Sequence, residues 1–467
     1  MSGFSVMSKE PSIIWAGIKE INDRIDAKYF HYDYMTFNLN DYDKVKNLDQ
    51  CVDFFETGVS NFNEGELRLK RLKTSNIQNN VVLYEDLIDC KIQKKDKRKI
   101  LQKGDVVLTT YGTGSIGKTA YINSDTQIVP DYTIAILRTK SNLDSGYLMS
   151  FFSSSYGNQQ VLRRVIGTSG ITLVIKPHLK DIKIPIPSPE IQKYIGDKVR
   201  RAEELREEAK TLQKDIDILL EVDILLEETD IINNIFHSKV NWTNEINIVD
   251  RIDPNFYQKK YRTTIEKLGD NKVELGELVK ISKRRYQTGD INKYIEISSI
   301  NNSFGTIDEV EELRPEEIPT SAKHQVKEGD ILVSLVRPTR KAISIVTKEY
   351  DNAICTGGFA VLQSKGKVPV EFLTAVLRTN FAEIQFERYC TGSTYPTINE
   401  NDVVKIFIPQ YSEKQINKIT EKYRRIIESI YRSKKLIQEA KQDVEDLIEG
   451  KFDMSKLNKD SGTESRC

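Results

Sequence analysis

The 467-residue sequence lacks the features that define several common classes of protein. It has no apolar run of about 18 residues, and no basic segment followed by an apolar run at its start, so we expect neither a membrane span nor secretion. Its five cysteines are scattered, odd in number and never at CxxC spacing, which argues against a disulfide framework or a structural zinc site. The predicted location is a reducing cytoplasm, and we expect no bound metal.

An excess of positive charge is also missing. Lysine plus arginine equals aspartate plus glutamate, at 69 each, whereas a typical DNA-binding domain is basic. An even balance can still hide basic faces, so the composition leaves nucleic-acid binding open. With 39% hydrophobic residues the chain can bury real cores, and its length suits two or three units of roughly 150 residues.

Catalytic motifs are absent or weak. There is no HExxH, no GxSxG and no Gly-rich cofactor fingerprint followed by an acid. Residues 112–119 match the P-loop pattern GxxxxGK[ST], which holds phosphate only where it follows a strand and opens a helix. Residues 120–130 are β-branched, rich in turn formers and end in proline, so they predict no helix. We interpret 112–119 as a turn between strands and predict no catalytic residues in the chain.

What the sequence does contain is an internal repeat. The recurring segments are 24–30 (RIDAKYF) and 251–257 (RIDPNFY), 103–108 and 328–333, 167–169 and 392–394, and Gln192 and Gln415, at offsets of 227, 225, 225 and 223 residues. Four anchors in the same order at a nearly constant offset predict a tandem duplication of about 225 residues.

Each half has the same order of predicted elements. Short β-branched runs such as 105–110 and 331–336 indicate strands, proline-containing runs at 182–187 and 404–409 indicate edge strands, and a long helix follows. The predicted fold class is α+β, with two mixed, strand-rich domains separated and joined by two long helices. The predicted boundaries are 1–188 and 239–411 for the globular domains, 189–238 and 412–450 for the helices, and 451–467 for a polar, frayed tail.

The two helices carry heptad seams. Apolar residues at alternating steps of three and four are Ala202, Leu205, Ala209, Leu212, Ile216 and Leu219, and Ile416, Ile419, Tyr423, Ile426, Ile430, Ile437, Ala440, Val444 and Leu447, with Ser433 interrupting the second seam. Because a globular domain lies between them, we favour antiparallel pairing within one chain. The alternative is that the seams join two copies of the protein.

Taken together, these features resemble the specificity (S) subunits of type I restriction–modification systems. The resemblance covers roughly residues 20–450. It is carried by the Arg-Ile-Asp start and Gly-Asp strand of each half, the turn Gly114-x-Ile116-Gly117-Lys118, the Gly-Thr/Ser segments and the Ile-Pro…Gln entry to each helix.

That resemblance implies a sequence-specific DNA-binding protein with no catalysis of its own. Each half would be a target-recognition domain for one part of an interrupted double-stranded DNA site. The helices would form an antiparallel coiled coil, and about 40 residues of helix would span about 60 Å as a spacer. The implied partners are methyltransferase (M) subunits, two of them, and restriction (R) subunits. S-adenosylmethionine, ATP and Mg²⁺ would bind those partners, and no cofactor would bind this chain.

Candidate DNA contacts follow from side-chain chemistry, because base and phosphate readers are polar or basic residues in loops and at strand ends. The candidates are Lys70, Arg71, Lys73, Tyr111, Thr113, Ser115, Lys118, Arg163, Arg164, Thr168 and Ser169 in the first half, and Lys283, Arg284, Arg285, Tyr286, Arg337, Arg340, Lys341, Ser393, Thr394 and Tyr395 in the second. Two other functions remain open: a P-loop nucleotide-binding enzyme, and a coiled-coil interaction scaffold that does not bind DNA.

Overall fold

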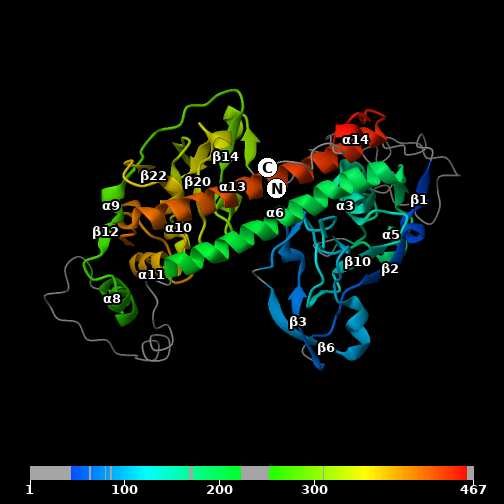
Figure 1. The fold of residues 1–467 in the computed structure, drawn as a ribbon, viewed down its shortest axis with the longest axis horizontal. Helices are drawn as coiled ribbons and strands as arrows, with labels where there is room; N and C mark the ends of the chain where they lie inside the picture. Colours follow the sequence, from blue (N-terminus) through cyan, green and yellow to red (C-terminus); the bar gives the residue numbers. More distant parts are fainter. Residues whose placement is uncertain are drawn as a thin grey trace. The chain divides into compact units, whose positions relative to one another are not determined.

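The computed structural model describes residues 44–62, 65–78, 80–84, 87–167, 172–221, 251, 253–308 and 310–459. The chain divides into two compact units, shown in Figure 1: unit 1 is Met1–Glu204 with Arg432–Cys467, and unit 2 is Leu205–Tyr431. Two long helices, α6 (Pro189–Glu221) and α13 (Glu413–Ile448), contribute to both units. The repeat anchor 24–30 and residues 222–238 of the predicted first long helix lie outside the described residues.

Unit 1 is built around a four-stranded antiparallel sheet with a second, smaller sheet beside it. The first has the order β2 (Val52–Thr57), β10 (Ile134–Thr139), β7 (Val106–Thr109), β8 (Thr119–Tyr121), and the second β6 (Ile88–Ile92), β3 (Leu67–Leu72), β9 (Ile128–Pro130). Two strand pairs complete the unit, β4 (Ile77–Gln78) with β5 (Val81–Val82) and β1 (Val45–Asn47) with β11 (Lys183–Pro185). Its short helices are α2 (Leu48–Cys51), η3 (Thr74–Asn76), η4 (Lys94–Lys99), α3 (Ser145–Ser153), α4 (Ser155–Arg163), α5 (Lys176–Lys180) and α14 (Lys456–Lys459).

Unit 2 repeats this architecture, with one additional strand, β18, in its second sheet. Its main sheet has the order β13 (Val279–Ile281), β22 (Phe359–Ser364), β19 (Ile331–Ser334), β20 (Ile343–Ile345), and its second sheet β17 (Glu311–Leu313), β14 (Asn292–Ile295), β21 (Ile354–Thr356), β18 (Ala322–Gln325). The strand pairs are β15 (Ile300–Asn301) with β16 (Thr306–Ile307) and β12 (Lys272–Glu274) with β23 (Phe407–Pro409). Its short helices are η6 (Pro254–Tyr257), α8 (Lys259–Glu266), α9 (Leu275–Leu278), η7 (Ile297–Ser299), η8 (Pro315–Glu317), η9 (Pro338–Arg340), η10 (Lys348–Tyr350), α10 (Val370–Leu377), α11 (Asn380–Tyr389) and α12 (Glu400–Val403). The duplication predicted from four short anchors therefore extends to the main sheet, the two strand pairs and three strands of the second sheet.

The central strands are buried throughout because both faces of the main sheet are covered. In β7, Val106 and Leu108 pack into the cluster that contains Tyr147 and Phe151 of α3, whereas Val107 packs into the cluster of the second sheet. Such two-sided burial explains a continuous Val-Val-Leu run in place of an alternating pattern. β19 shows the same continuous burial in unit 2.

The two long helices pair in an antiparallel sense, as the fold class predicts. In unit 1, Val199 and Ala202 of α6 share a core with Ala440 and Val444 of α13. In unit 2, Leu212 and Ile216 share a core with Tyr423 and Ile426. Ion pairs flank both stretches: Lys198 Nζ lies 2.5 Å from Asp443 Oδ2, Lys422 Nζ lies 2.6 Å from Asp215 Oδ2, and Arg425 pairs with Glu208. The further a residue lies along α6, the earlier its partner lies in α13, so the two helices run in opposite directions. Both helices belong to the same chain.

Two details of the seam differ from the heptad reading. Leu220 is the buried residue at the end of the described part of α6, and Leu219 is only partly buried against the same core. Ser433, which interrupts the apolar pattern, is fully buried in α13, so the seam continues there through a small side chain. Ile416 lies at the edge of the seam and is partly buried.

Phe452 and Leu457 pack against unit 1, in contrast to the frayed tail that the polarity of 451–467 suggested, although Lys451 and residues 453–455 are exposed. The ring of Phe452 lies 6.1 Å from that of Tyr194, and Leu457 also contacts the core of unit 1. Lys456 Nζ lies 2.7 Å from Asp443 Oδ1. Two apolar residues and one ion pair thus suffice to hold this short segment; residues 460–467 lie outside the described part of the chain.

Candidate nucleic-acid interface

In unit 2 most of the candidate residues lie at one end of the main sheet. Strands β13 and β19 both run antiparallel to β22, so the end of β13, the end of β19 and the start of β22 lie together. Segment 283–286 follows β13, and segment 335–341 joins β19 to β20. Loops at one end of a rigid sheet are a common place for binding residues.

In each unit, β-bridges join a second segment of the chain to the loop that follows the third strand of the main sheet. In unit 2, Val336 and Thr391 both form β-bridges with Thr397, which ties the exposed stretch Ser393, Thr394 and Tyr395 to the loop after β19. In unit 1, Tyr111 and Ile166 form the equivalent bridges with Leu173.

The loop of unit 1 carries Tyr111, Thr113, Ser115 and Lys118 beside this bridge. Thr113 Oγ1 lies 3.1 Å from Thr172 Oγ1, and Tyr111 meets Tyr132 edge to face at 5.6 Å. Thr168 and Ser169 lie outside the described residues. Residues 112–118 form a turn between the antiparallel strands β7 and β8, and no helix follows, so the phosphate-binding geometry of a P-loop does not form.

The remaining candidates of unit 1 have different surroundings. Lys70 forms an exposed ion pair with Asp89 at 2.9 Å, and Lys73 follows the end of β3. Arg71 pairs with Asp131, and its guanidinium lies 4.1 Å from the centre of the Phe62 ring. Arg163 ends α4 and is partly buried.

Arg164, by contrast, belongs to the interior of unit 1. It is buried, and its Nη1 and Nη2 donate to the carbonyl oxygens of Gln160 at 2.9 Å and Asp181 at 3.0 Å. The Arg164 side chain is therefore buried and bound to main-chain carbonyl groups next to the end of α4. Because it does not face solvent, we assign Arg164 no DNA contact.

The candidates of unit 2 also divide into anchored and exposed side chains. Arg284 pairs with the buried Asp330, and Lys341 Nζ donates to Asn380 Oδ1 at 2.8 Å. Lys283, Arg285 and Arg340 are exposed. The exposed group is therefore the one best placed to meet phosphates.

A buried aspartate precedes the central strand of each unit, and sequence reasoning missed its partner. Asp105 accepts the backbone N–H of Gln102, and Asp330 accepts that of Lys327, both at 2.8 Å. Burial raises the pKa of both carboxyl groups, while an arginine opposes the shift in each case. That arginine is Arg138 on β10 in unit 1 but Arg284 after β13 in unit 2. In the sequence, only the repeated Gly-Asp pair pointed to these aspartates, and it could not identify which arginine pairs with each of them.

A cleft of about 1010 Å³ opens beside the exposed group of unit 2. It is lined by Lys283, Arg285, Tyr286, Gln287, Thr288, Ala322, Lys323, His324 and Glu400. His324 is buried, and its Nε2 has no hydrogen-bond partner in the described part of the chain. Burial and the charge of Lys323 lower the pKa of His324 below its ordinary 6.5, although Glu400, 3.7 Å away, acts in the opposite direction.

Mild acid is expected to destabilise unit 2 through this histidine. The unfolded chain binds a proton at a pKa near 6.5 and the folded chain only at lower pH, so stability falls as the pH drops through 6.5. The expected result is a lower free energy of unfolding at pH 5.5 than at pH 7.5, measured by denaturant unfolding. His324→Gln should flatten this dependence and Glu400→Gln should steepen it. An unchanged slope in His324→Gln would contradict the assignment.

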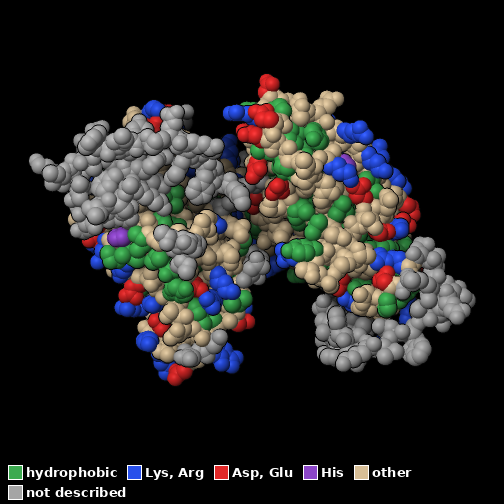
Figure 2. All heavy atoms as spheres, turned by 180° about the vertical axis from the view of Figure 1, so that it is seen from behind, with side chains coloured by type: hydrophobic (Ala, Val, Ile, Leu, Met, Phe, Trp, Pro, Cys, Tyr) green, Lys and Arg blue, Asp and Glu red, His purple; other side chains and the backbone are tan. Residues whose placement is uncertain are grey.

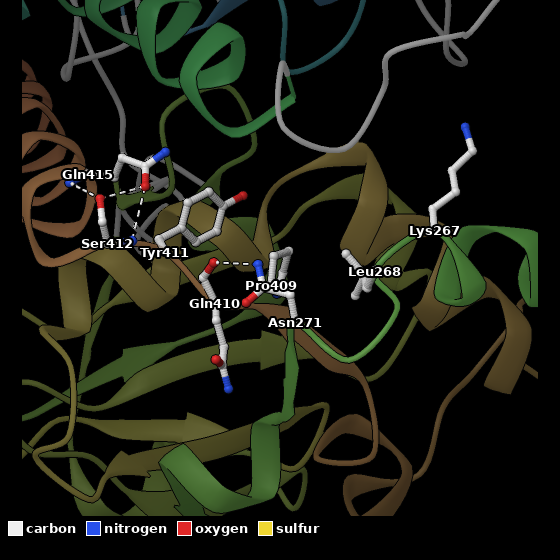
Figure 3. A pocket seen from close by; sticks show the side chains of 8 residues that line it. All are labelled: Lys267, Leu268, Asn271, Pro409, Gln410, Tyr411, Ser412 and Gln415. Carbon is white, nitrogen blue, oxygen red and sulfur yellow. Dashed lines mark hydrogen bonds between the residues drawn. The ribbon is translucent and has the colours of Figure 1, made fainter.

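A second pocket, of about 590 Å³, lies between the residues that precede β12 and the segment that joins β23 to α13 (Figure 3). Two hydrogen bonds join residues that line it: Asn271 Nδ2 donates to the Gln410 carbonyl at 3.3 Å, and the Ser412 hydroxyl donates to Gln415 Oε1 at 2.7 Å at the helix start. These contacts fix the entry of the chain into α13, and we assign no ligand to the pocket.

Other site types find no support in the described residues. They contain no group of three or more His, Cys, Asp or Glu side chains that could hold a metal ion, and none of their helices has the length and apolar character needed to cross a membrane. On the face drawn in Figure 2, lysine and arginine side chains are interspersed with aspartate and glutamate.

Comparison with known proteins identifies part of the chain. Residues 52–216 match the family model of the type I restriction modification DNA specificity domain. No curated protein matches the chain. Among solved structures, it is similar to the type I restriction-modification system S subunit from M. genitalium, at 13% identity and a TM-score of 0.43, covering 90% of this chain and 98% of that one. It is also similar to the HsdS subunit from Thermoanaerobacter tengcongensis, at 16% identity and a TM-score of 0.29, covering 88% and 96%.

Residues 52–216 thus match the type I restriction modification DNA specificity domain, and the resemblance drawn from the sequence is confirmed. The predicted function, DNA sequence specificity within such a system, is supported by the same match. Neither alternative, the P-loop enzyme or the scaffold without DNA binding, gains support.

Proposed function

We propose that this chain directs the methyltransferase and nuclease subunits of a type I restriction–modification complex to a bipartite DNA site. The observation that carries the proposal is the repeat. Unit 1 contains most of the segment that matches the specificity domain, and unit 2 has the same strand order in its main sheet and the same bridged loops. One chain then holds two DNA readers of one architecture.

The two readers should recognise different sequences. The loop after the third strand of the main sheet reads Gly-Thr-Gly-Ser-Ile-Gly at 112–117 in unit 1 and Val-Arg-Pro-Thr-Arg-Lys at 336–341 in unit 2. Base edges are distinguished by the donors and acceptors that such loops present, so unlike loops imply unlike half-sites. The proposed target is therefore interrupted and asymmetric.

We further propose that the chain itself is non-catalytic. The duplication offers two equivalent surfaces, which suits two methyltransferase subunits, with restriction subunits joining them. S-adenosylmethionine would be held by the former, and ATP and Mg²⁺ by the latter. Helices α6 and α13, with 33 and 36 residues, are each about 50 Å long, and their length would set the unread spacer of the site.

Co-expression with the candidate methyltransferase subunit, followed by mapping of methylated adenines in host DNA, tests the proposal. The expected result is one interrupted, asymmetric motif that disappears when this chain is omitted. A methylation pattern that does not depend on the chain, with no complex formed, would overturn the proposal.

A further inference from the structure

One arginine in the unit 2 loop has an unfavourable backbone conformation. The non-glycine residues with positive φ in the described part of the chain are Asn80, Arg337, Lys341 and Asn352. Asparagine tolerates the left-handed region, but arginine and lysine do not. Arg337, at φ 49°, also precedes Pro338, and a following proline pushes a residue towards extended conformations.

The repeat shows what this backbone position calls for. In unit 1 the equivalent loop has glycine at Gly112 (φ 94°) and Gly117 (φ 89°), where the left-handed region carries no penalty. Gly112 N donates to the Thr172 carbonyl at 3.0 Å, and Arg337 N donates to the Pro396 carbonyl at 2.7 Å, so the two residues hold the same place. Unit 2 thus carries an arginine where the scaffold favours glycine.

Lys341 has a structural reason for its strain, but Arg337 does not. Lys341 Nζ reaches α11, at 2.8 Å from Asn380 Oδ1 and 3.6 Å from Glu383 Oε2. Arg337 instead donates from Nη2 to the Thr394 carbonyl at 3.1 Å, and its guanidinium lies 4.3 Å from the centre of the Tyr395 ring. Tyr395 is itself 65% exposed. A strained backbone at a residue whose side chain does not pack into the core is a sign of a functional residue.

We propose that Arg337 is a base-reading residue of unit 2 and that it recognises a guanine in the major groove. Guanine presents two acceptors there, O6 and N7, which match the fork of a guanidinium. Of the five donors of Arg337, the described structure uses one. Stacking on Tyr395 and the bond to Thr394 fix the plane of the group before DNA arrives, so little freedom is lost on binding. The inference rests on the proposed function and refines it for one half-site.

The test uses the intact complex with its methyltransferase subunits and the mapped DNA site. Binding is measured for duplexes in which each base pair of the second half-site is changed in turn, and for duplexes with 7-deazaguanine, which lacks the N7 acceptor. For the unaltered complex we expect a loss of about tenfold or more at one guanine. In Arg337→Gly that guanine should become interchangeable, and 7-deazaguanine should cause no further loss.

Stability distinguishes a reader from a structural residue. Because glycine fits the backbone at this position, Arg337→Gly should keep or raise the melting temperature of the complex while losing discrimination. Arg337→Lys should keep the charge but lose the bidentate contact with guanine O6 and N7. Asn352→Gly, the same type of change at another left-handed residue, serves as the control and should leave discrimination unchanged.

The outcomes separate this inference from the proposed function. A site that still requires the chain, but is read equally well by Arg337→Gly, overturns the inference and leaves the proposed function intact. A lower melting temperature with a uniform loss across all duplexes also overturns it, because Arg337 would then be a structural or phosphate-binding residue. If no site depends on the chain, both fail.

Discussion

A chain that ends after Tyr431 is expected to lose the fold of unit 1. The deleted residues lie more than 200 residues away in sequence from the strands of that unit. Unit 1 combines Met1–Glu204 with Arg432–Cys467. Truncation would remove Ile437, Ala440, Val444 and Leu447, which share its core. Each large apolar side chain contributes about 1.5–3 kcal/mol, against a total stability of about 5–15 kcal/mol for a domain. Hydrogen exchange of the β7 and β10 amides should change from protected to fast.

Two comparisons make this experiment decisive. Truncation after Lys459 removes none of the described contacts and should leave exchange unchanged. A synthetic peptide of residues 432–459, added to the shorter truncated chain, should restore protection. An Asp443→Ala peptide should restore it less well, because the buried Asp443 carboxylate accepts from both Lys198 and Lys456. Full protection of unit 1 in the chain that ends after Tyr431 would refute the expectation.

The architecture could be predicted from the sequence because its signals are local or repeated. The heptad seams of α6 and α13 depend only on residue spacing. The loop at 112–117 could be interpreted as a turn, because the residues that follow it are typical of a strand. The repeat then needed only four anchors, since the corresponding strands of the two units keep a nearly constant offset.

The candidate interface was less predictable because side-chain partners are distant in sequence. Arg163 and Arg164 are neighbours of the same type, yet Arg164 is buried against two carbonyl groups. The aspartates at 105 and 330 are equivalent, yet Arg138 comes from strand β10 and Arg284 from the segment after β13. Composition could not reveal the strained backbone of Arg337 either, since φ depends on how the loop is closed by residues 391–397.

Arg378→Ala is expected to destabilise unit 2 more than any other single change to an arginine considered above. Arg378 is buried at the end of α10, and burial lowers its pKa. Its Nη1 donates to the carbonyls of Lys341 at 2.8 Å and Ile343 at 3.1 Å, and its Nη2 donates to that of Asn302 at 2.7 Å. No carboxylate pairs with it among the described residues, so three main-chain acceptors share the charge.

Removing this side chain leaves the buried Ile343 carbonyl without its donor, whereas the Lys341 carbonyl still accepts the Ile343 N–H at 2.7 Å. An unsatisfied buried group costs about 1–3 kcal/mol, so the free energy of unfolding of unit 2 should fall by about 2 kcal/mol. Denaturant unfolding followed by hydrogen exchange of β19 measures the change. Arg262→Ala removes an exposed arginine, whose i,i+4 pair with Glu266 spans 3.7 Å, and should change stability by less than about 0.5 kcal/mol.

Arg378 also connects stability to DNA reading, because Lys341 closes the loop that carries Arg337. Loss of its bond to the Lys341 carbonyl should loosen that loop even where the unit stays folded. In stabilising buffer, Arg378→Ala should therefore bind the cognate site more weakly and discriminate less at the guanine assigned to Arg337. Arg378→Lys keeps a charge but cannot reach three carbonyls at once. Its affinity and its discrimination should therefore lie between those of Arg378→Ala and those of the unaltered complex. If Arg378→Ala were no less stable than Arg262→Ala, the buried arginine would not hold this loop, and the preorganisation proposed for Arg337 would have to come from residues 391–397 alone.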